Sequence, residues 1–138
     1  IRCRAAKAAR MAPPSFLSAS LLVALGAALG AWLRFVAGRL AGASAFPWAT
    51  LGVNVIGSFA MGLLAGWLAR HGQGGEHWRL LIGVGVLGGF TTFSAFSLEL
   101  ALMIERGSLG LAALYAAVSV IAGLAGLFAG LAMMKVAA

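Results

Sequence analysis

The sequence predicts an all-α membrane protein with four transmembrane helices, and three observations support this prediction. Of the 138 residues, 62% are hydrophobic and 9% are charged, whereas soluble domains average about 25% charged residues. Apolar runs recur along the chain, each reaching the roughly 20 residues that cross ~30 Å of hydrocarbon. Glycine occurs 20 times, about twice its usual share of ~7%, which is typical of closely packed membrane helices.

The predicted spans cover residues 16–40, 47–69, 78–104 and 109–134. Their linkers, AGASAF, RHGQGGEH and ERGS, are short, and the middle one is the most polar. We therefore expect a single transmembrane domain over residues 16–138, preceded by an N-terminal extension over residues 1–15.

The extension raises a question about where the native chain starts. Four of its basic residues precede Met11, and the only cysteine, Cys3, lies there too. These residues are expected to be disordered or a non-native start. A secretory signal peptide is the competing interpretation of the first apolar run, but the run is long, carries Arg34 near its end, and is followed by further spans.

The charges flanking the spans are balanced. Counted from Met11, each side of the predicted membrane carries three Lys or Arg residues. Such a balance gives almost no orientation preference under the positive-inside rule, so the chain could insert both ways and form an antiparallel, dual-topology homodimer. If the first ten residues belong to the protein, the count becomes seven against three and this argument weakens. The two sets from Met11 onward are Arg70, Arg79 and Lys135, and Arg34, Arg39 and Arg106.

Glycines four residues apart recur in every span, a spacing that lets two helix backbones approach closely. Tight helix packing is a sufficient explanation for all of them. The pairs are Gly26 and Gly30, Gly62 and Gly66, Gly85 and Gly89, and Gly126 and Gly130.

The segment GGFTTFSAFSLE, residues 88–99, predicts a break in the third helix near mid-membrane. Gly88 and Gly89 weaken a helix, and the hydroxyls of Thr91, Thr92 and Ser94 can bond the freed backbone groups. Irregular backbone at membrane depth is tolerated only where protein buries it or it lines a cavity. Carbonyls freed at such a break can coordinate a cation, although a simple glycine kink remains possible.

Several uncharged groups near this segment suit a small anion. Phe93 and Phe96 are three residues apart and share a helix face, and phenyl rings have electropositive edges. Asn54 lies mid-span and offers an amide donor. Ring edges, an amide and hydroxyls could replace part of an anion's water, although helix packing explains each residue taken alone.

Other polar residues extend this pattern. Tyr115 and Ser119 share a face of the fourth span, with Gly123 one turn further on. Arg34 could extend its charge to the membrane interface. Glu99 could pair with a cation, accept from a backbone donor, or lie in a wet vestibule.

Three segments together resemble the signatures of the Fluc (CrcB) fluoride channel family. They are GAALGAWLRF at 26–35, PWATLGVNVIGSF at 47–59, and GVLGGFTTFSAFSLE at 85–99. The resemblance covers essentially everything after Met11. It implies antiparallel homodimers that export fluoride passively through two pores at the subunit interface of the cell inner (plasma) membrane.

The resemblance also implies roles for individual residues. A structural Na⁺ at the dimer centre would be bound by the carbonyls of Gly88 and Thr91, and Arg34 and Glu99 would take the remaining polar positions near the vestibule. Some family members continue the row of hydroxyls begun by Tyr115 and Ser119 with another hydroxyl, where this chain has Gly123 and later Leu127. The chain therefore departs from the family pattern in the outer part of that row. The residues expected to line the fluoride pore are Asn54, Thr92, Phe93, Ser94, Phe96, Tyr115 and Ser119.

Competing functions leave these residues less well explained. His71 and His77 lie in the polar loop without a nucleophile or carboxylate pair, so no enzyme is expected. A small dual-topology, proton-coupled multidrug exporter is the main alternative, but residues 16–40 lack the carboxylate it would need. A non-transporting membrane subunit would explain the glycine pairs but not Asn54 or the TTFS cluster.

Overall fold

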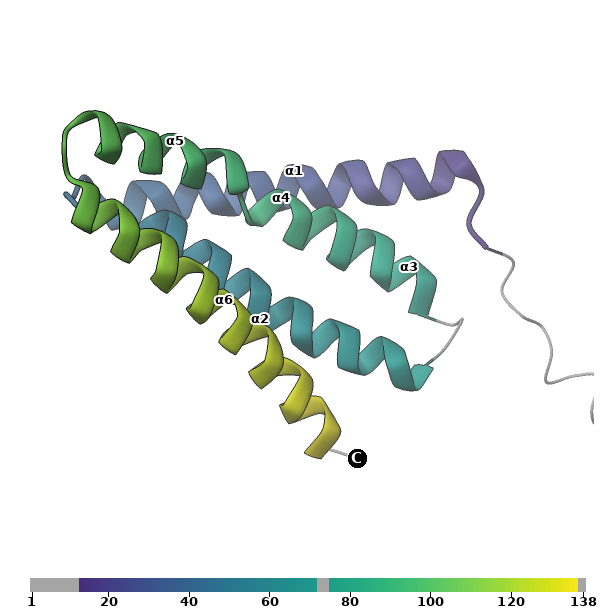
Figure 1. The fold of residues 1–138 in the computed structure, drawn as a ribbon. Helices are drawn as coiled ribbons and strands as arrows, with labels where there is room; N and C mark the ends of the chain where they lie inside the picture. The colour runs from purple at the N-terminus through teal and green to yellow at the C-terminus, as the bar shows by residue number, and fades with distance from the viewer. Residues whose placement is uncertain (1–12, 72–74, 137–138) are drawn as a thin grey trace, which may run out of the picture.

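The computed structural model describes residues 13–71 and 75–136, and every regular element in these ranges is a helix (Figure 1). Four helical segments are long and apolar enough to cross a membrane, and their ends fall within two residues of the predicted spans. They are α1 (Phe16–Ala41), α2 (Trp48–His71), a compound third span over Glu76–Glu105, and α6 (Leu109–Val136).

The third span is built from four consecutive helical pieces. These are α3 (Glu76–Trp78), η3 (Arg79–Leu87), α4 (Gly88–Phe90) and α5 (Phe93–Glu105). The η3 segment is wound more widely than an α-helix, and the Gly88 amide after it donates both to Gly83 and to Gly85. This winding was not predicted, because apolar periodicity does not separate a wide helix from an α-helix over nine residues.

Local sequence features set several helix ends. The Ser15 side chain accepts from the Ser18 amide and caps the start of α1. Pro47 lacks an amide hydrogen, so it fits immediately before α2, where it leaves no donor unpaired. Gly107 adopts a left-handed conformation with φ +76° and ends α5, and the next amide, of Ser108, donates to Met103.

The first helix pair joins α1 to the third span through glycines. A Cβ added at Gly26 would come within 2.9 Å of the Cα of Gly85, and one at Gly30 within 2.8 Å of the Phe90 amide. Gly89 packs in the same way on Ala27. The predicted close approach of these backbones is confirmed, and it leaves no room for side chains.

The second helix pair joins α2 to α6, which run side by side (Figure 1). A Cβ at Gly130 would come within 2.8 Å of the Leu63 amide, and one at Gly62 within 3.0 Å of the Leu131 amide. A Cβ at Gly66 would meet the Met134 side chain at 2.6 Å. The remaining two glycine pairs therefore also mark helix contacts.

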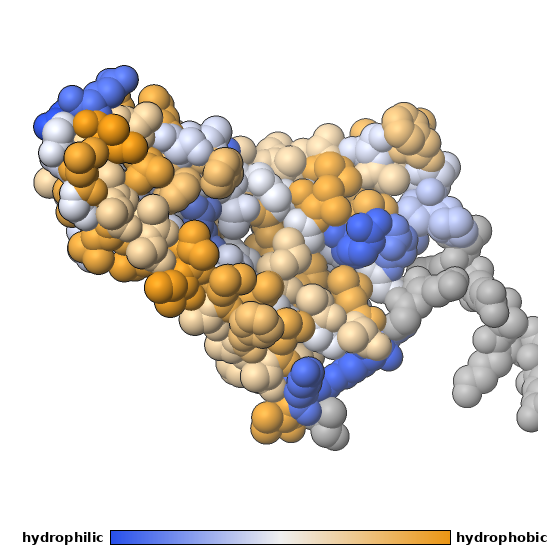
Figure 2. Space-filling model, viewed as in Figure 1, coloured by the Kyte–Doolittle hydropathy of each residue, from blue (hydrophilic) through white to orange (hydrophobic). Residues whose placement is uncertain are grey.

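Few side chains are buried within this single chain. The hydrophobic cluster of buried residues lies where α2, α5 and α6 meet and comprises Leu51, Met103, Ala112 and Tyr115. Large apolar side chains such as Phe16, Trp32 and Phe128 are exposed. In Figure 2 apolar side chains cover most of the visible face, and the larger hydrophilic groups gather toward its ends. Such a surface requires lipid or another protein to cover it.

Predictions about the first residues fall largely outside the described ranges. The expected extension over residues 1–15 is represented only by residues 13–15, which are not helical and lead directly into α1. Residues 1–12, with Cys3 and the four basic residues before Met11, lie outside the described part of the chain.

Candidate functional site

The site begins at two extended residues between α4 and α5. Thr91 has ψ 157°, and Thr92 has φ −150° and ψ 123°, so both leave the helical region. The Thr92 hydroxyl accepts from the Ala95 amide at 3.2 Å and caps α5, while the Thr91 hydroxyl donates to the Leu87 carbonyl at 2.9 Å. The Thr92 hydroxyl therefore replaces the backbone acceptor that a continuous helix would have supplied, whereas the Thr91 hydroxyl adds a second donor to a carbonyl that already accepts from the Thr91 amide.

Asn54 on α2 fixes the extended segment from the side. Its Oδ1 accepts from the Thr92 amide at 2.8 Å, and its Nδ2 donates to the Thr92 carbonyl at 3.0 Å. The amide thus satisfies both backbone groups of Thr92. Because Nδ2 carries two hydrogens, one of them remains for another acceptor.

Three carbonyls beside the extended residues lose their usual helical donors. The Thr92 amide, which would donate to Gly88 in a continuous helix, donates to Asn54 instead. The Ala95 amide, which would donate to Thr91, donates to the Thr92 hydroxyl. The Gly89 carbonyl accepts from Nε of Arg34 at 3.1 Å. The Arg34 side chain therefore reaches from α1 to the third span. The sequence alone had suggested that this side chain could extend to the membrane interface.

Aromatic rings continue from the extended residues toward α6. The ring centroids of Phe93 and Phe96 are 5.6 Å apart, and those of Phe96 and Tyr115 are 5.0 Å apart. Phe93 is 79% exposed in the single chain, whereas Tyr115 is fully buried. The series thus runs from the protein surface to the interior.

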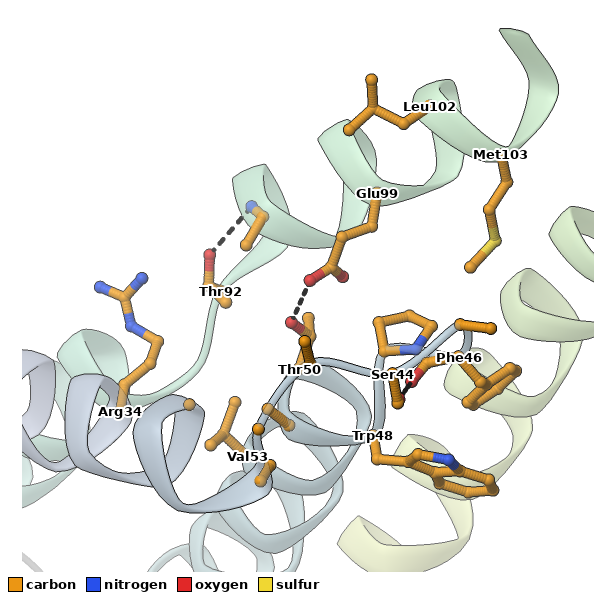
Figure 3. A pocket seen from close by; sticks show the side chains of 18 of the residues that line it. Arg34, Ser44, Phe46, Trp48, Thr50, Val53, Thr92, Glu99, Leu102 and Met103 are labelled. Carbon is orange, nitrogen blue, oxygen red and sulfur yellow. Dashed lines mark hydrogen bonds between the residues drawn. The ribbon is translucent and has the colours of Figure 1, made fainter. Parts of the chain in front are cut away.

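Glu99 lies six residues beyond Phe93 on α5 and accepts hydrogen bonds from two hydroxyls. It accepts from Thr50 at 2.7 Å and from Tyr115 at 2.8 Å. The carboxylate faces a cavity of about 440 Å³ that Arg34, Thr92 and Arg106 also line (Figure 3). A vestibule position was one of the alternatives raised by the sequence, and it stays a prediction. The two hydroxyl donors were not foreseen.

The other predicted hydroxyls occupy different surroundings. The Oγ atom of Ser119 is buried and, among the described residues, has no hydrogen-bond partner. Ser94 is exposed, with its Oγ 3.2 Å from the Thr92 hydroxyl. A Cβ at Gly123 would lie 3.6 Å from Oγ of Ser58. The backbone of Leu127 packs against Gly62, so this position takes part in the contact between α2 and α6 and adds no hydroxyl.

Two polar residues near the site, Thr50 and Ser58, were not singled out from the sequence. Thr50 is 7% exposed and donates to Glu99. Both residues are four positions from Asn54, so all three share one face of α2. The same spacing rule that linked Tyr115 to Ser119 would have found them.

Charged clusters are scarce among the residues that the structure describes. No group of three or more His, Cys, Asp or Glu side chains there could hold a metal ion. The single salt bridge in the described ranges joins Arg79 to Glu76 at 2.8 Å, on the surface. A cation at the extended segment would therefore depend on backbone carbonyls.

The fold and the site define a multi-pass membrane protein whose polar side chains converge on an extended segment within one span. The chain belongs to the CrcB family, because residues 21–131 match the family described as CrcB-like protein, Camphor Resistance (CrcB). The four spans and this family together indicate the cell inner (plasma) membrane.

Curated relatives cover most of this chain. The fluoride-specific ion channel FluC of Novosphingobium aromaticivorans is 63% identical over 124 residues, which are 86% of this chain and 98% of the relative. The protein of the same name from Rhodopseudomonas palustris is 54% identical, over 83% of this chain and 95% of the relative. That from Caulobacter vibrioides is 51% identical, over 83% and 94%.

Proposed function

We propose that this protein is a fluoride-selective ion channel that passively exports fluoride. The single observation that supports this best is the cluster of uncharged donors around Thr92, found in a member of the CrcB family. The relatives named as fluoride-specific ion channels supply the identity of the ion. Ring edges and amide groups alone would not distinguish fluoride from another small anion.

In the proposed mechanism, hydrogen-bond donors and ring edges that point toward the ion replace the water around fluoride. The free Nδ2 hydrogen of Asn54 and the electropositive edges of Phe93 and Phe96 provide donors without a fixed positive charge. The hydroxyls of Thr92, Ser94, Tyr115 and Ser119 would extend this lining. Because binding in a pore must be favourable yet weak enough for release, neutral donors suit conduction better than an arginine would.

We further propose that two antiparallel copies form the pores between them. Phe93 is 79% exposed in the single chain, which is unusual for an aromatic ring that would contact an ion. A second copy would cover it and exclude water. The balanced Lys and Arg counts favour insertion in both orientations.

The segment at Thr91 and Thr92 suits a backbone cation site at the centre of this dimer, near mid-membrane. The carbonyls of Gly88 and Thr91 have lost their usual helical donors to side chains. Sodium prefers oxygen ligands, and freed carbonyls at interrupted membrane helices are suitable ones. When bound, sodium would supply positive charge that holds the two copies together, with the second copy providing the remaining ligands.

Arg34 and Glu99 are assigned to supporting and vestibule positions. Arg34 would fix the extended segment through the Gly89 carbonyl, to which it donates. Glu99 would keep the hydroxyls of Thr50 and Tyr115 in fixed orientations at the cavity. Its negative charge would repel an anion, which favours a place beside the path and not in its narrowest part.

A small proton-coupled multidrug exporter is not favoured. That chemistry needs a membrane-embedded carboxylate, usually in the first helix, and residues 16–40 contain none. Glu99 lies in the third span and already accepts from two hydroxyls. Neither the family nor the relatives' names point to drug export.

The test is ion efflux from liposomes that contain the purified protein. Fluoride and chloride release are measured in the same vesicles, each with its own ion electrode. We expect fluoride release to be far faster than chloride release, because a larger anion fits poorly between the rings. Equal rates would contradict selectivity.

Two separate experiments address the assembly. Replacing sodium throughout purification is expected to weaken the dimer measured by light scattering, since the two copies would share the ion. Dimers of unchanged stability would contradict the sodium proposal. Cross-linking that joins only like ends of two copies would contradict the antiparallel arrangement.

A further inference from the structure

The helices α2 and α6 run in the same direction and stay in register. Along α2, Gly62 packs against Leu127 and Gly66 against Met134, so position increases along both helices together. Near the N-terminal ends of the two helices, Leu51 of α2 and Tyr115 of α6 lie in one buried cluster. Residues at equivalent steps of the two helices therefore lie at the same level of the pair.

Polar residues occupy the first three levels of this pair. At the first level, Thr50 on α2 and Tyr115 on α6 donate to the same carboxylate, Glu99. One turn further, Asn54 and Ser119 follow at four-residue spacing. A third step of four residues reaches Ser58 on α2 and Gly123 on α6.

The third level has a hydroxyl on only one of its two helices. A Cβ at Gly123 would lie 3.6 Å from Oγ of Ser58, an ordinary contact distance. The Ser58 hydroxyl is therefore next to the place that a side chain at position 123 would occupy. Beyond this level Gly62 meets the backbone of Leu127, and the polar series ends.

We infer that Ser58 supplies from α2 the hydroxyl that position 123 of α6 lacks, and that it is a further fluoride-contacting residue of the pore. This inference rests on the proposed fluoride channel. With Ser58, the second and third levels of the α2–α6 pair each have a side-chain donor for the ion, whereas the two hydroxyls of the first level donate to Glu99. The series of donors then runs from the cavity at Glu99 past the buried Ser119 hydroxyl to Ser58.

The surroundings of Ser58 favour a ligand role over a packing role. Among the described residues its hydroxyl makes no hydrogen bond, in contrast to Ser97, which donates to the Phe93 carbonyl at 2.9 Å within its own helix. Ser58 is half-buried and faces a glycine, so a small ligand can approach it. A serine needed only for packing could be replaced by alanine without loss.

The test moves the hydroxyl from one helix to the other. Ser58→Ala should lower the fluoride efflux rate roughly tenfold, the effect of losing one hydrogen bond to an ion. Ser58→Ala combined with Gly123→Ser should restore most of the rate, because the new side chain enters open space beside position 58. Ser58→Ala combined with Gly123→Ala should not restore it, since it adds volume without a hydroxyl.

Three results would overturn the inference in a wild-type protein that conducts fluoride. They are an unchanged rate in Ser58→Ala, equal rates in the two double variants, and a dimer lost in Ser58→Ala at the same protein concentration. Absence of fluoride efflux in the wild-type protein would instead contradict the proposed function itself. Ser97→Ala is the matched control and should conduct like wild type.

Discussion

The two helix pairs use glycine in the same way but differ in what else they contain. The α1 pair brings Gly26 and Gly30 against Gly85 and the Phe90 amide, with backbone touching backbone. The α2–α6 pair has its tightest glycine contacts, at Gly62 and Gly130, in its C-terminal half. Its N-terminal half carries the polar residues Thr50, Asn54, Ser58, Tyr115 and Ser119.

The difference indicates that the glycine contacts support the fold, whereas the polar residues serve its function. Close glycine contacts need only shape, and they hold the third span firmly against α1. Polar groups in a membrane interior are costly to keep and usually have a role. The N-terminal half of the α2–α6 pair, which carries the polar residues, is therefore where an ion path is expected.

The largest effect is expected from breaking the glycine pair of α1. Gly30→Ala would place a Cβ within 2.8 Å of the Phe90 amide. Backbone cannot move aside cheaply, so unfolding free energy should fall by about 3 kcal/mol. Thermal unfolding in detergent measures the loss.

Gly38 offers the matched control for that change. It lies on the same helix, with nothing within 4 Å of an added Cβ. Gly38→Ala should leave stability unchanged or raise it by up to about 1 kcal/mol, because alanine favours the helix. Equal losses in the two variants would show that close approach is not what position 30 requires.

A smaller effect on stability, but a large one on transport, is expected at the aromatic rings. Phe93→Ile should cut fluoride efflux strongly while the dimer stays intact, because isoleucine has no electropositive ring edge. Phe96→Ile should also lower stability somewhat, since Phe96 packs on Tyr115 at 5.0 Å between ring centroids.

Phe128 provides the comparison for the rings. It is 64% exposed on α6, in the C-terminal half of the pair. Phe128→Ile should conduct like wild type, as only the polar half is expected to carry the ion. Undiminished efflux in both Phe93→Ile and Phe96→Ile would remove the ring edges from the mechanism.

Much of the fold could be predicted from sequence because a bilayer allows few solutions. Four apolar runs had to become helices, and glycines at four-residue spacing had to meet another backbone. The wide winding of η3 could not be predicted, since apolar periodicity over nine residues does not separate a wide helix from an α-helix.

Individual site residues could be selected from sequence more easily than their partners. Asn54, Phe93, Phe96 and Tyr115 were recognisable as polar or aromatic groups in apolar spans. That Asn54 binds both backbone groups of Thr92 required the register between α2 and α5. The bond from Arg34 to Gly89 joins residues 55 positions apart, which no local pattern encodes.

The polar half of the α2–α6 pair is tested most directly by Ser119→Ala, with stability and fluoride efflux measured on the same preparation. The Ser119 hydroxyl is buried without a partner among the described residues, and an unsatisfied buried group destabilises a fold by about 1–3 kcal/mol. If this hydroxyl serves fluoride, the variant should be at least as stable as wild type yet conduct several-fold more slowly. Wild-type efflux from a variant of equal or greater stability would contradict the account.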